Sequence, residues 1–186
     1  MTTAADVVIC AAWLLMIGHN AVLALMGVRQ AAELGRWTAG LVLAVVLVAA
    51  GIWLEERSGG RLAAPLAVVV AGTIATGAGA LVHLIARARL GRAWSTRPAS
   101  PPHLVEDGPY AVVRHPLYAG VTLVALGTMA AHPSVPTLAG GAGLLAGLTL
   151  KIRDEERVLA ARFGARWDAY RRRVPRLVPR VASRGR

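Results

Sequence analysis

Residues 108–120 read GPYAVVRHPLYAG and carry the most unusual chemistry of the chain. Two tyrosines, an arginine, a histidine and two prolines stand there between an arginine-rich segment and an apolar run. Polar and ionisable groups at the edge of a bilayer are costly and are usually kept for a function. We therefore expect this segment to hold a small polar cofactor beside a lipid-borne substrate.

The composition around this segment indicates a membrane protein. Of 186 residues, 55% are hydrophobic, and the mean hydropathy is +0.52, whereas soluble domains are about 45–50% apolar. The formal charge of +11 comes almost entirely from arginine, since Lys151 is the single lysine. A basic chain can bind nucleic acid, but long apolar runs separated by basic loops favour a membrane. The single cysteine, Cys10, excludes a disulfide scaffold and a cysteine metal site.

Five apolar runs predict an all-α integral membrane protein with about five transmembrane helices. A helix needs roughly 20 residues to cross a bilayer. The runs are residues 7–28, 38–54, 65–85, 117–131 and 137–150. The first lacks a charged leading region, so we interpret it as a retained helix and not a signal peptide.

The last two runs form a predicted helical hairpin. Each has only about 15 residues, or roughly 22 Å of helix. Either the two helices span the membrane together with their flanks, or they form a re-entrant hairpin. We favour the spanning pair, because His115 and Lys151 can extend the helices beyond the hydrocarbon.

The distribution of positive charge predicts the orientation. The successive loops carry 2, 2, 5 and 0 Lys and Arg residues, and the tail carries 12. With the N-terminus outside, 19 of these residues face the cytoplasm and 2 face outward, which satisfies the positive-inside rule. We therefore expect a multi-pass protein of a bacterial-type inner (plasma) membrane, with residues 87–114 and the tail on the cytoplasmic side.

From Lys151 onward, the apolar residues recur at helical steps of four, four, three and four. They are Leu159, Phe163, Trp167, Tyr170 and Val174. This pattern predicts one C-terminal amphipathic cytosolic helix. Its other faces are rich in arginine, so we expect it to lie on an anionic leaflet.

The hairpin brings its two ends together, and so joins two polar clusters into one site. Arg114 and His115 then meet Lys151 and Glu155, which lie four residues apart on one helix face. Glu155 and Glu156 point about 100° apart, so at most one of them can aim directly at a given ligand. The alternative is a salt-bridged lid between Arg114 and a glutamate. No histidine has companions at metal-ligand spacing, so we expect no metal site.

The two polar clusters together resemble a known family of enzymes. The first motif is Gly108-x-Tyr110-x-x-x-Arg114-His115-Pro116-x-Tyr118-x-Gly120. The second, some 35 residues on, is Glu155-Glu156-x-x-Leu159-x-x-x-Phe163-Gly164, then Tyr170 and Arg173-Val174-Pro175-Arg176. At this separation they resemble the isoprenylcysteine carboxyl methyltransferase and phospholipid methyltransferase family, over about residues 100–177.

The resemblance implies a membrane-embedded methyltransferase that uses S-adenosyl-L-methionine without a Rossmann-like domain. It divides the chain into three N-terminal spans (1–90), a catalytic region (91–180) and a disordered tail (181–186). The implied cofactor-binding residues are Leu104, Val105, Tyr110, His115, Pro116, Leu117, Tyr118 and Glu155. A glutamate suits the α-ammonium of the cofactor, aromatic faces suit its sulfonium, and donors such as His115 suit its carboxylate.

The acceptor implied by the resemblance is a lipophilic small molecule or a lipidated substrate, and we favour a carboxylate on it. Arg114 and Lys151 are the candidate catalytic residues that would hold such a carboxylate. In carboxyl-methylating relatives an arginine stands where this chain has Lys151. The lysine keeps the positive charge but cannot bind a carboxylate through two parallel hydrogen bonds as a guanidinium does. Methylation of a phospholipid amine and a non-catalytic membrane scaffold or transporter are the alternatives. We expect membrane lipids, and no nucleic acid, as partners.

Overall fold

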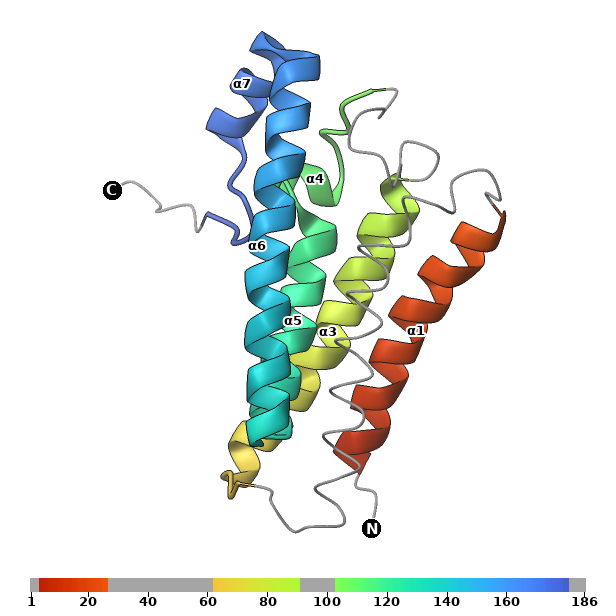
Figure 1. Cartoon of the computed structure of the whole chain (residues 1–186), viewed down its shortest axis with the longest axis vertical. Coiled ribbons are helices and arrows are strands. Elements are labelled where there is room, and N and C mark those ends of the chain that lie inside the picture. The colour runs from red at the N-terminus through yellow and green to blue at the C-terminus, as the bar shows by residue number, and fades with distance from the viewer. Residues whose placement is uncertain (1–3, 27–61, 91–102, 181–186) are drawn as a thin grey trace.

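The computed structural model describes residues 4–26, 62–90 and 103–180. The regular elements among these residues are all helices, with no strand, which confirms the all-α prediction for this part of the chain. Their helices are α1 (Ala4–Met26), α3 (Leu66–Leu90), α4 (Pro109–Val112), α5 (Pro116–Ala131), α6 (Val135–Phe163) and α7 (Ala165–Arg173) (Figure 1). The predicted span at 38–54 and the predicted disordered tail at 181–186 lie outside the described residues.

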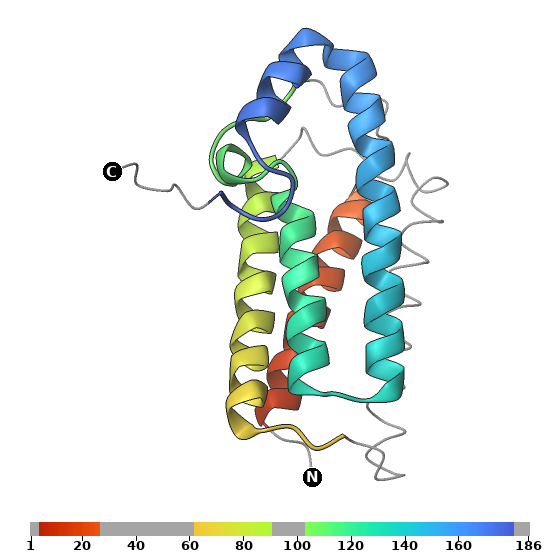
Figure 2. The ribbon, with the colours of Figure 1, turned by 90° about the vertical axis from the view of Figure 1, so that its left-hand side faces the viewer.

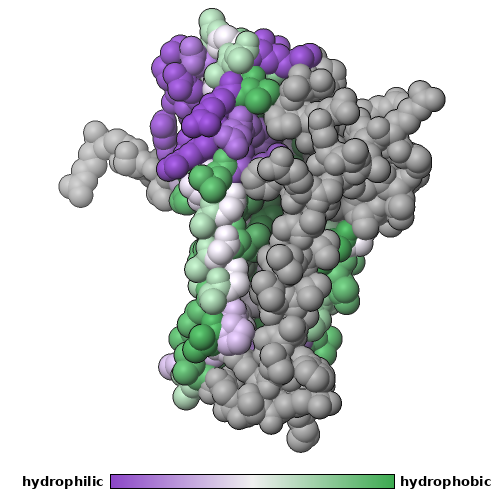
Figure 3. All heavy atoms as spheres, viewed as in Figure 1, coloured by the Kyte–Doolittle hydropathy of each residue, from purple (hydrophilic) through white to green (hydrophobic). Residues whose placement is uncertain are grey.

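Four long helices, α1, α3, α5 and α6, lie side by side, and α4 and α7 gather at one end of them (Figures 1 and 2). Two of the four, α3 and α6, are long and apolar enough to cross a membrane, while α5 and the first part of α1 are shorter apolar helices. Large apolar side chains such as Leu14, Leu66 and Ile74 are exposed on their outer surfaces. Figure 3 shows apolar residues along the shaft and polar residues gathered around α7 and the end of α6. This division suits a shaft in lipid and a polar cap in water.

Glycines bring α3 and α5 into backbone contact. A Cβ placed on Gly79 would lie 2.7 Å from the carbonyl oxygen of Gly120, and one on Gly72 would lie 2.7 Å from that of Gly127. Gly72 and Gly79 are seven residues apart, as are Gly120 and Gly127, so each pair lies on one helix face. Small residues at such positions let helices pack closely in a membrane. The close contact fixes α5, and therefore the start of the polar segment, against α3.

The hairpin of α5 and α6 is antiparallel along the long axis of the molecule (Figure 2). Ser134 caps α6, since its Oγ accepts a hydrogen bond from the backbone N–H of Thr137 over 3.1 Å. The helix continues past the apolar run to Phe163, about 43 Å in all at 1.5 Å per residue. It therefore carries Lys151, Glu155 and Glu156 on its polar half.

The prediction of one continuous C-terminal amphipathic helix is wrong. Gly164 ends α6 with φ +50° and ψ −125°, and α7 then folds back beside it (Figure 2). Only glycine reaches this conformation at low cost. The apolar stripe still buries a common surface, because Trp167, Tyr170 and Val174 pack with Leu104 and with the last turns of α6. The predicted apolar residues therefore share one buried surface, although they lie on two helices joined by a turn.

Candidate active site

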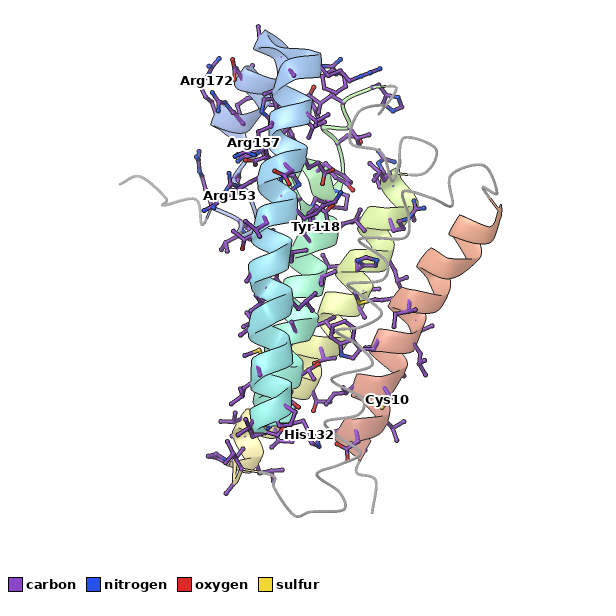
Figure 4. The ribbon with its side chains drawn as sticks, viewed as in Figure 1. Cys10, Tyr118, His132, Arg153, Arg157 and Arg172 are labelled. Atoms are coloured by element: carbon purple, nitrogen blue, oxygen red, sulfur yellow. The ribbon has the colours of Figure 1, made fainter. Side chains whose placement is uncertain are left out.

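The polar residues converge where α4, the start of α5, α6 and α7 meet. Tyr118, on the first turn of α5, extends between α5 and α6 (Figure 4). Its hydroxyl donates a hydrogen bond to Glu155 Oε2 over 2.7 Å. The Tyr118 ring also stacks on the His115 ring, with the centroids 5.7 Å apart and the planes 29° apart. Tyr118 and His115 thus present adjoining aromatic faces beside a carboxylate.

Glu156 is the centre of a separate ionic cluster. Its Oε1 accepts hydrogen bonds from Arg114 Nε (3.2 Å) and Nη2 (2.9 Å), and His115 Nε2 lies 3.2 Å from the same oxygen. Arg176 donates to both carboxylate oxygens of Glu156. The Arg114 and Glu156 side chains are only 11% and 14% exposed. Three basic side chains therefore surround this glutamate, and an ion pair between Arg114 and a glutamate is present.

The segment after α7, which we term the C-terminal strap (residues 174–180), is bonded to the same place. The backbone N–H groups of Arg114 and His115 donate to the carbonyls of Pro175 (2.8 Å) and Arg176 (3.1 Å). Arg114 Nη1 also donates to the carbonyls of Arg171 (2.9 Å) and Val174 (2.5 Å). Arg114 thus joins α6, α7 and the strap, which is a positioning role.

Two buried tyrosines connect the cap to the bundle. The Tyr170 hydroxyl donates to the carbonyl of Tyr110 over 2.7 Å, and the Tyr110 hydroxyl lies 3.5 Å from the carbonyl of Ala86 on α3. Burial raises the pKa of the Tyr110 phenol, with a smaller contribution from Glu155. Burial likewise raises the pKa of the Tyr170 phenol. Both phenols therefore stay protonated and remain hydrogen-bond donors at any physiological pH.

Ion pairs hold the loop before α4 against its neighbours. Glu106 accepts from Arg166 (2.8 Å) and Arg173 (2.9 Å) of α7, and Asp107 pairs with Arg89 of α3. Gly108, with φ +57°, then turns the chain into α4. The loop is consequently held next to α7 by Glu106 and next to α3 by Asp107.

The structure brings most of the predicted residues to one end of the molecule. Leu104, Tyr110, His115 and Pro116 are buried there, and Val105, Arg114, Leu117, Tyr118, Lys151 and Glu155 are partly buried. Three of them contact one another through their side chains: Tyr118 bonds to Glu155 and stacks on His115. Pro116 and Leu117 serve by their position at the start of α5, and the Leu117 carbonyl lies 3.3 Å from His83 Nδ1.

Several residues of the site were not identified as such from the sequence. They are Glu106, Glu156, Trp167, Tyr170 and Arg176. Arg176 and Tyr170 do stand in the second motif, so the motif itself was the available signal. Glu156 also stands in that motif, but helical spacing separates it from Glu155 without showing which of the two faces the basic cluster.

Glu155 is the glutamate suited to a cationic ligand. One of its oxygens accepts the Tyr118 hydroxyl, and within the described ranges Oε1 of Glu155 has no hydrogen-bond donor. Glu156, by contrast, is surrounded by two guanidinium groups and an imidazole. An ammonium group placed at Glu156 would be repelled by the two guanidinium groups, whereas at Glu155 it would meet a carboxylate and a phenol. Among the described side chains, no three His, Cys, Asp or Glu residues group as a metal ion would require.

The part of the chain that contains the two polar clusters is similar to known proteins. Residues 72–161 fit the sequence model of the isoprenylcysteine carboxyl methyltransferase (ICMT) family. Over 79 residues the chain is 46% identical to methanethiol S-methyltransferase 2 of Bradyrhizobium diazoefficiens, covering 41% of this chain and 29% of that protein. It is 40% identical over 79 residues to protein-S-isoprenylcysteine O-methyltransferase of Schizosaccharomyces pombe, covering 42% of this chain and 34% of that protein.

The alignments thus span about a third of the length of these curated relatives. No solved structure matches the chain significantly. The family match covers α5, most of α3 and most of α6, and so includes Arg114, His115, Tyr118, Glu155 and Glu156. Residues 72–161, which supply Arg114, His115, Tyr118, Glu155 and Glu156 to the site, are therefore similar to the isoprenylcysteine carboxyl methyltransferase family.

Proposed function

We propose that the protein is a membrane-embedded methyltransferase that uses S-adenosyl-L-methionine to methylate a lipophilic acceptor at the cytoplasmic membrane face. The family assignment and the methyltransferase names of both relatives support the reaction type. The long apolar helices α3 and α6 support a membrane location, and the 19-to-2 distribution of positive charge supports the orientation.

The observation that carries the proposal is the different surroundings of the two adjacent glutamates. Glu155 pairs with a neutral phenol, so its negative charge is left to attract a cation such as the α-ammonium of the cofactor. The stacked rings of His115 and Tyr118 lie beside it and offer π faces to a sulfonium. The carboxylate and the two rings fit the cofactor that the family implies.

When bound, the cofactor supplies an electrophilic methyl group on a positively charged sulfur. The chain's own residues then have to orient this group and exclude water from it. In the proposal, Glu155, Tyr118 and the backbone around Leu104 and Val105 orient the polar end of the cofactor. Arg114 and Glu156 would keep the strap and α7 closed over it, because they bond to both.

For the acceptor, we propose a carboxylate on a lipophilic molecule, with Lys151 as its cation. Lys151 lies one helical turn before Glu155 on the same face of α6. Arg114 is a weaker candidate than the sequence indicated, because its guanidinium is already bonded to Glu156 and to two backbone carbonyls. A thiol acceptor is the second candidate, favoured by the similarity to a methanethiol S-methyltransferase.

Labelling of membranes with methyl-labelled S-adenosyl-L-methionine tests the proposal and separates the acceptors. Membranes that contain the protein should gain label that Glu155→Gln membranes lack and Asp154→Asn membranes retain. Label released as methanol by mild base indicates an ester, volatile label that is stable to base indicates a methylated thiol, and stable label on lipid headgroups indicates an amine. Equal labelling of membranes with and without the protein would refute methyl transfer.

A further inference from the structure

Arginines that the site does not use stand on the outside of α6, α7 and the strap. Arg153, Arg157 and Arg172 point outward on the same side of the molecule (Figure 4). Arg153, Arg172 and Arg180 have no carboxylate within ion-pair distance among the residues that the structure describes, and Arg157 pairs only with the exposed Asp154. The arginines that build the cap, by contrast, are matched to Glu106, Asp168 and Glu156. The outward arginines therefore leave positive charge that the protein does not neutralise.

The position of Arg153 and Arg157 along α6 places this charge at the membrane surface. The apolar part of α6 ends at Leu150. At 1.5 Å per residue, Arg153 lies about 4.5 Å and Arg157 about 10 Å beyond it. The headgroup layer on each side of a bilayer is roughly 5–8 Å thick. Arg153 consequently falls at the level of the lipid phosphates, and the backbone of Arg157 lies just outside that layer, within reach of it for a long arginine side chain.

The strap reaches the same level on the neighbouring surface. The carbonyl of Arg176 accepts from the backbone N–H of His115, the residue immediately before α5. Arg176 also pairs with Glu156, which lies between Arg153 and Arg157 along α6, so the strap lies at the level of these two arginines. Further along the strap, Val178 is 76% exposed, and the exposed Arg180 donates to the carbonyl of Arg172 over 3.4 Å. An exposed apolar side chain next to an exposed arginine is a typical interfacial pattern.

We propose that Arg153, Arg157 and Arg180, with the exposed Val178, form an interaction surface for anionic phospholipids of the cytoplasmic leaflet. A guanidinium binds a phosphate through two parallel hydrogen bonds, and each basic residue near an anionic surface adds about 1 kcal/mol of attraction. No side chain of this surface takes part in the hydrogen bonds described around Glu155 and Glu156. The inference rests on the proposed membrane placement but not on methyl transfer.

Retention of lipid tests this surface directly. The full-length protein is placed in discs of phosphatidylcholine with 30% phosphatidylglycerol, released, and weighed with its bound lipids by native mass spectrometry. Wild type should retain phosphatidylglycerol in excess of its share of the mixture. Arg153→Gln/Arg180→Gln should lose at least half of this excess, and 0.5 M salt should weaken it in wild type.

The matched control is Arg171→Gln/Arg172→Gln, which removes the same charge from α7, farther from the apolar shaft. It should retain phosphatidylglycerol as wild type does. Equal losses in both double variants would show a nonspecific effect of net charge and would overturn the proposal, as would the absence of any excess in wild type. If the Arg153/Arg180 double variant does not fold, as judged by gel filtration, Arg153→Gln alone should lose part of the excess. Because the readout is bound lipid, an inactive methyltransferase would not alter the outcome.

Discussion

Two adjacent glutamates divide the work of the site between them. Glu155 faces Tyr118, and Glu156 faces Arg114, His115 and Arg176. The sequence predicted that at most one of the two could face a ligand, because successive helical residues point about 100° apart. It also predicted Glu155 as the ligand-binding member through the family motif. That assignment stays a prediction, but the saturation of Glu156 by basic groups supports it.

Glu156→Ala should destabilise the protein by about 2 kcal/mol, because it leaves two guanidinium groups facing each other without their shared carboxylate. The midpoint of thermal unfolding in detergent, followed by tryptophan fluorescence, measures this loss. Asp154→Ala is the matched control on the same helix, since its partner Arg157 is exposed and such pairs contribute at most about 1 kcal/mol. Similar midpoints for both variants would show that the cluster at Glu156 does not hold the cap.

Close packing of glycines explains how α5 is positioned, and it can be tested with two neighbouring glycines of α3. Gly79→Ala should lower the thermal midpoint, because its Cβ would lie 2.7 Å from the backbone of α5. Gly77 has nothing within 4 Å of a Cβ, so Gly77→Ala should leave the midpoint unchanged or raise it slightly. A Gly77→Ala variant as unstable as Gly79→Ala would contradict the packing.

The turn between α6 and α7 depends on the backbone of Gly164. Its φ of +50° and ψ of −125° should cost any other residue about 1–3 kcal/mol, although a Cβ there would meet nothing within 4 Å. Gly164→Ala should therefore loosen α7 and speed hydrogen exchange of the backbone amides of Trp167 and Tyr170. Gly147→Ala, in the open part of α6, is the control and should leave that exchange unchanged. Unchanged exchange in Gly164→Ala would show that α7 does not need the turn.

At the level of elements, the hydrophobic pattern predicted where helices lie but not where the chain turns between them. The runs at 65–85 and 117–131 anticipate α3 and α5 to within a few residues, because burial in lipid or against another helix selects apolar side chains. The continuation of α6 to Phe163 and its end at Gly164 were missed. A stripe of apolar residues continues through the turn, so periodicity alone could not show that the second half folds back. The role of Arg114 also needed the structure, since a guanidinium suits a substrate and a glutamate equally well.

For the whole molecule, the orientation gives a further prediction. In a Cys10→Ser background, Val135→Cys lies at the exposed start of α6, at the end of the bundle opposite the cap. A membrane-impermeant maleimide added to intact cells should label this cysteine and should spare Arg172→Cys on α7. After the cells are opened, both should react, because both positions are exposed. Labelling of Arg172→Cys in intact cells would place the site outside and contradict the proposed topology.

The separation of an apolar shaft from a polar cap is consistent with methyl transfer from a charged cofactor to a lipophilic acceptor. An apolar shaft can admit a lipophilic acceptor from the side, and a polar cap built by α4, α7 and the strap can hold a charged cofactor above it (Figure 3). The cap is fixed to the shaft by Tyr110, Tyr170 and the Glu156 cluster. The site at Tyr118 and Glu155 lies where the two parts join.

Titration calorimetry of the purified protein in detergent with S-adenosyl-L-methionine tests this central claim most directly. Wild type should bind with one site per chain, and Asp154→Asn should bind as wild type does. Glu155→Gln should weaken binding about tenfold or more, since a charged hydrogen bond is worth about 1.5–3 kcal/mol. No binding by wild type, or equal affinity of wild type and Glu155→Gln, would contradict the assignment of Glu155 as the residue that holds the cofactor.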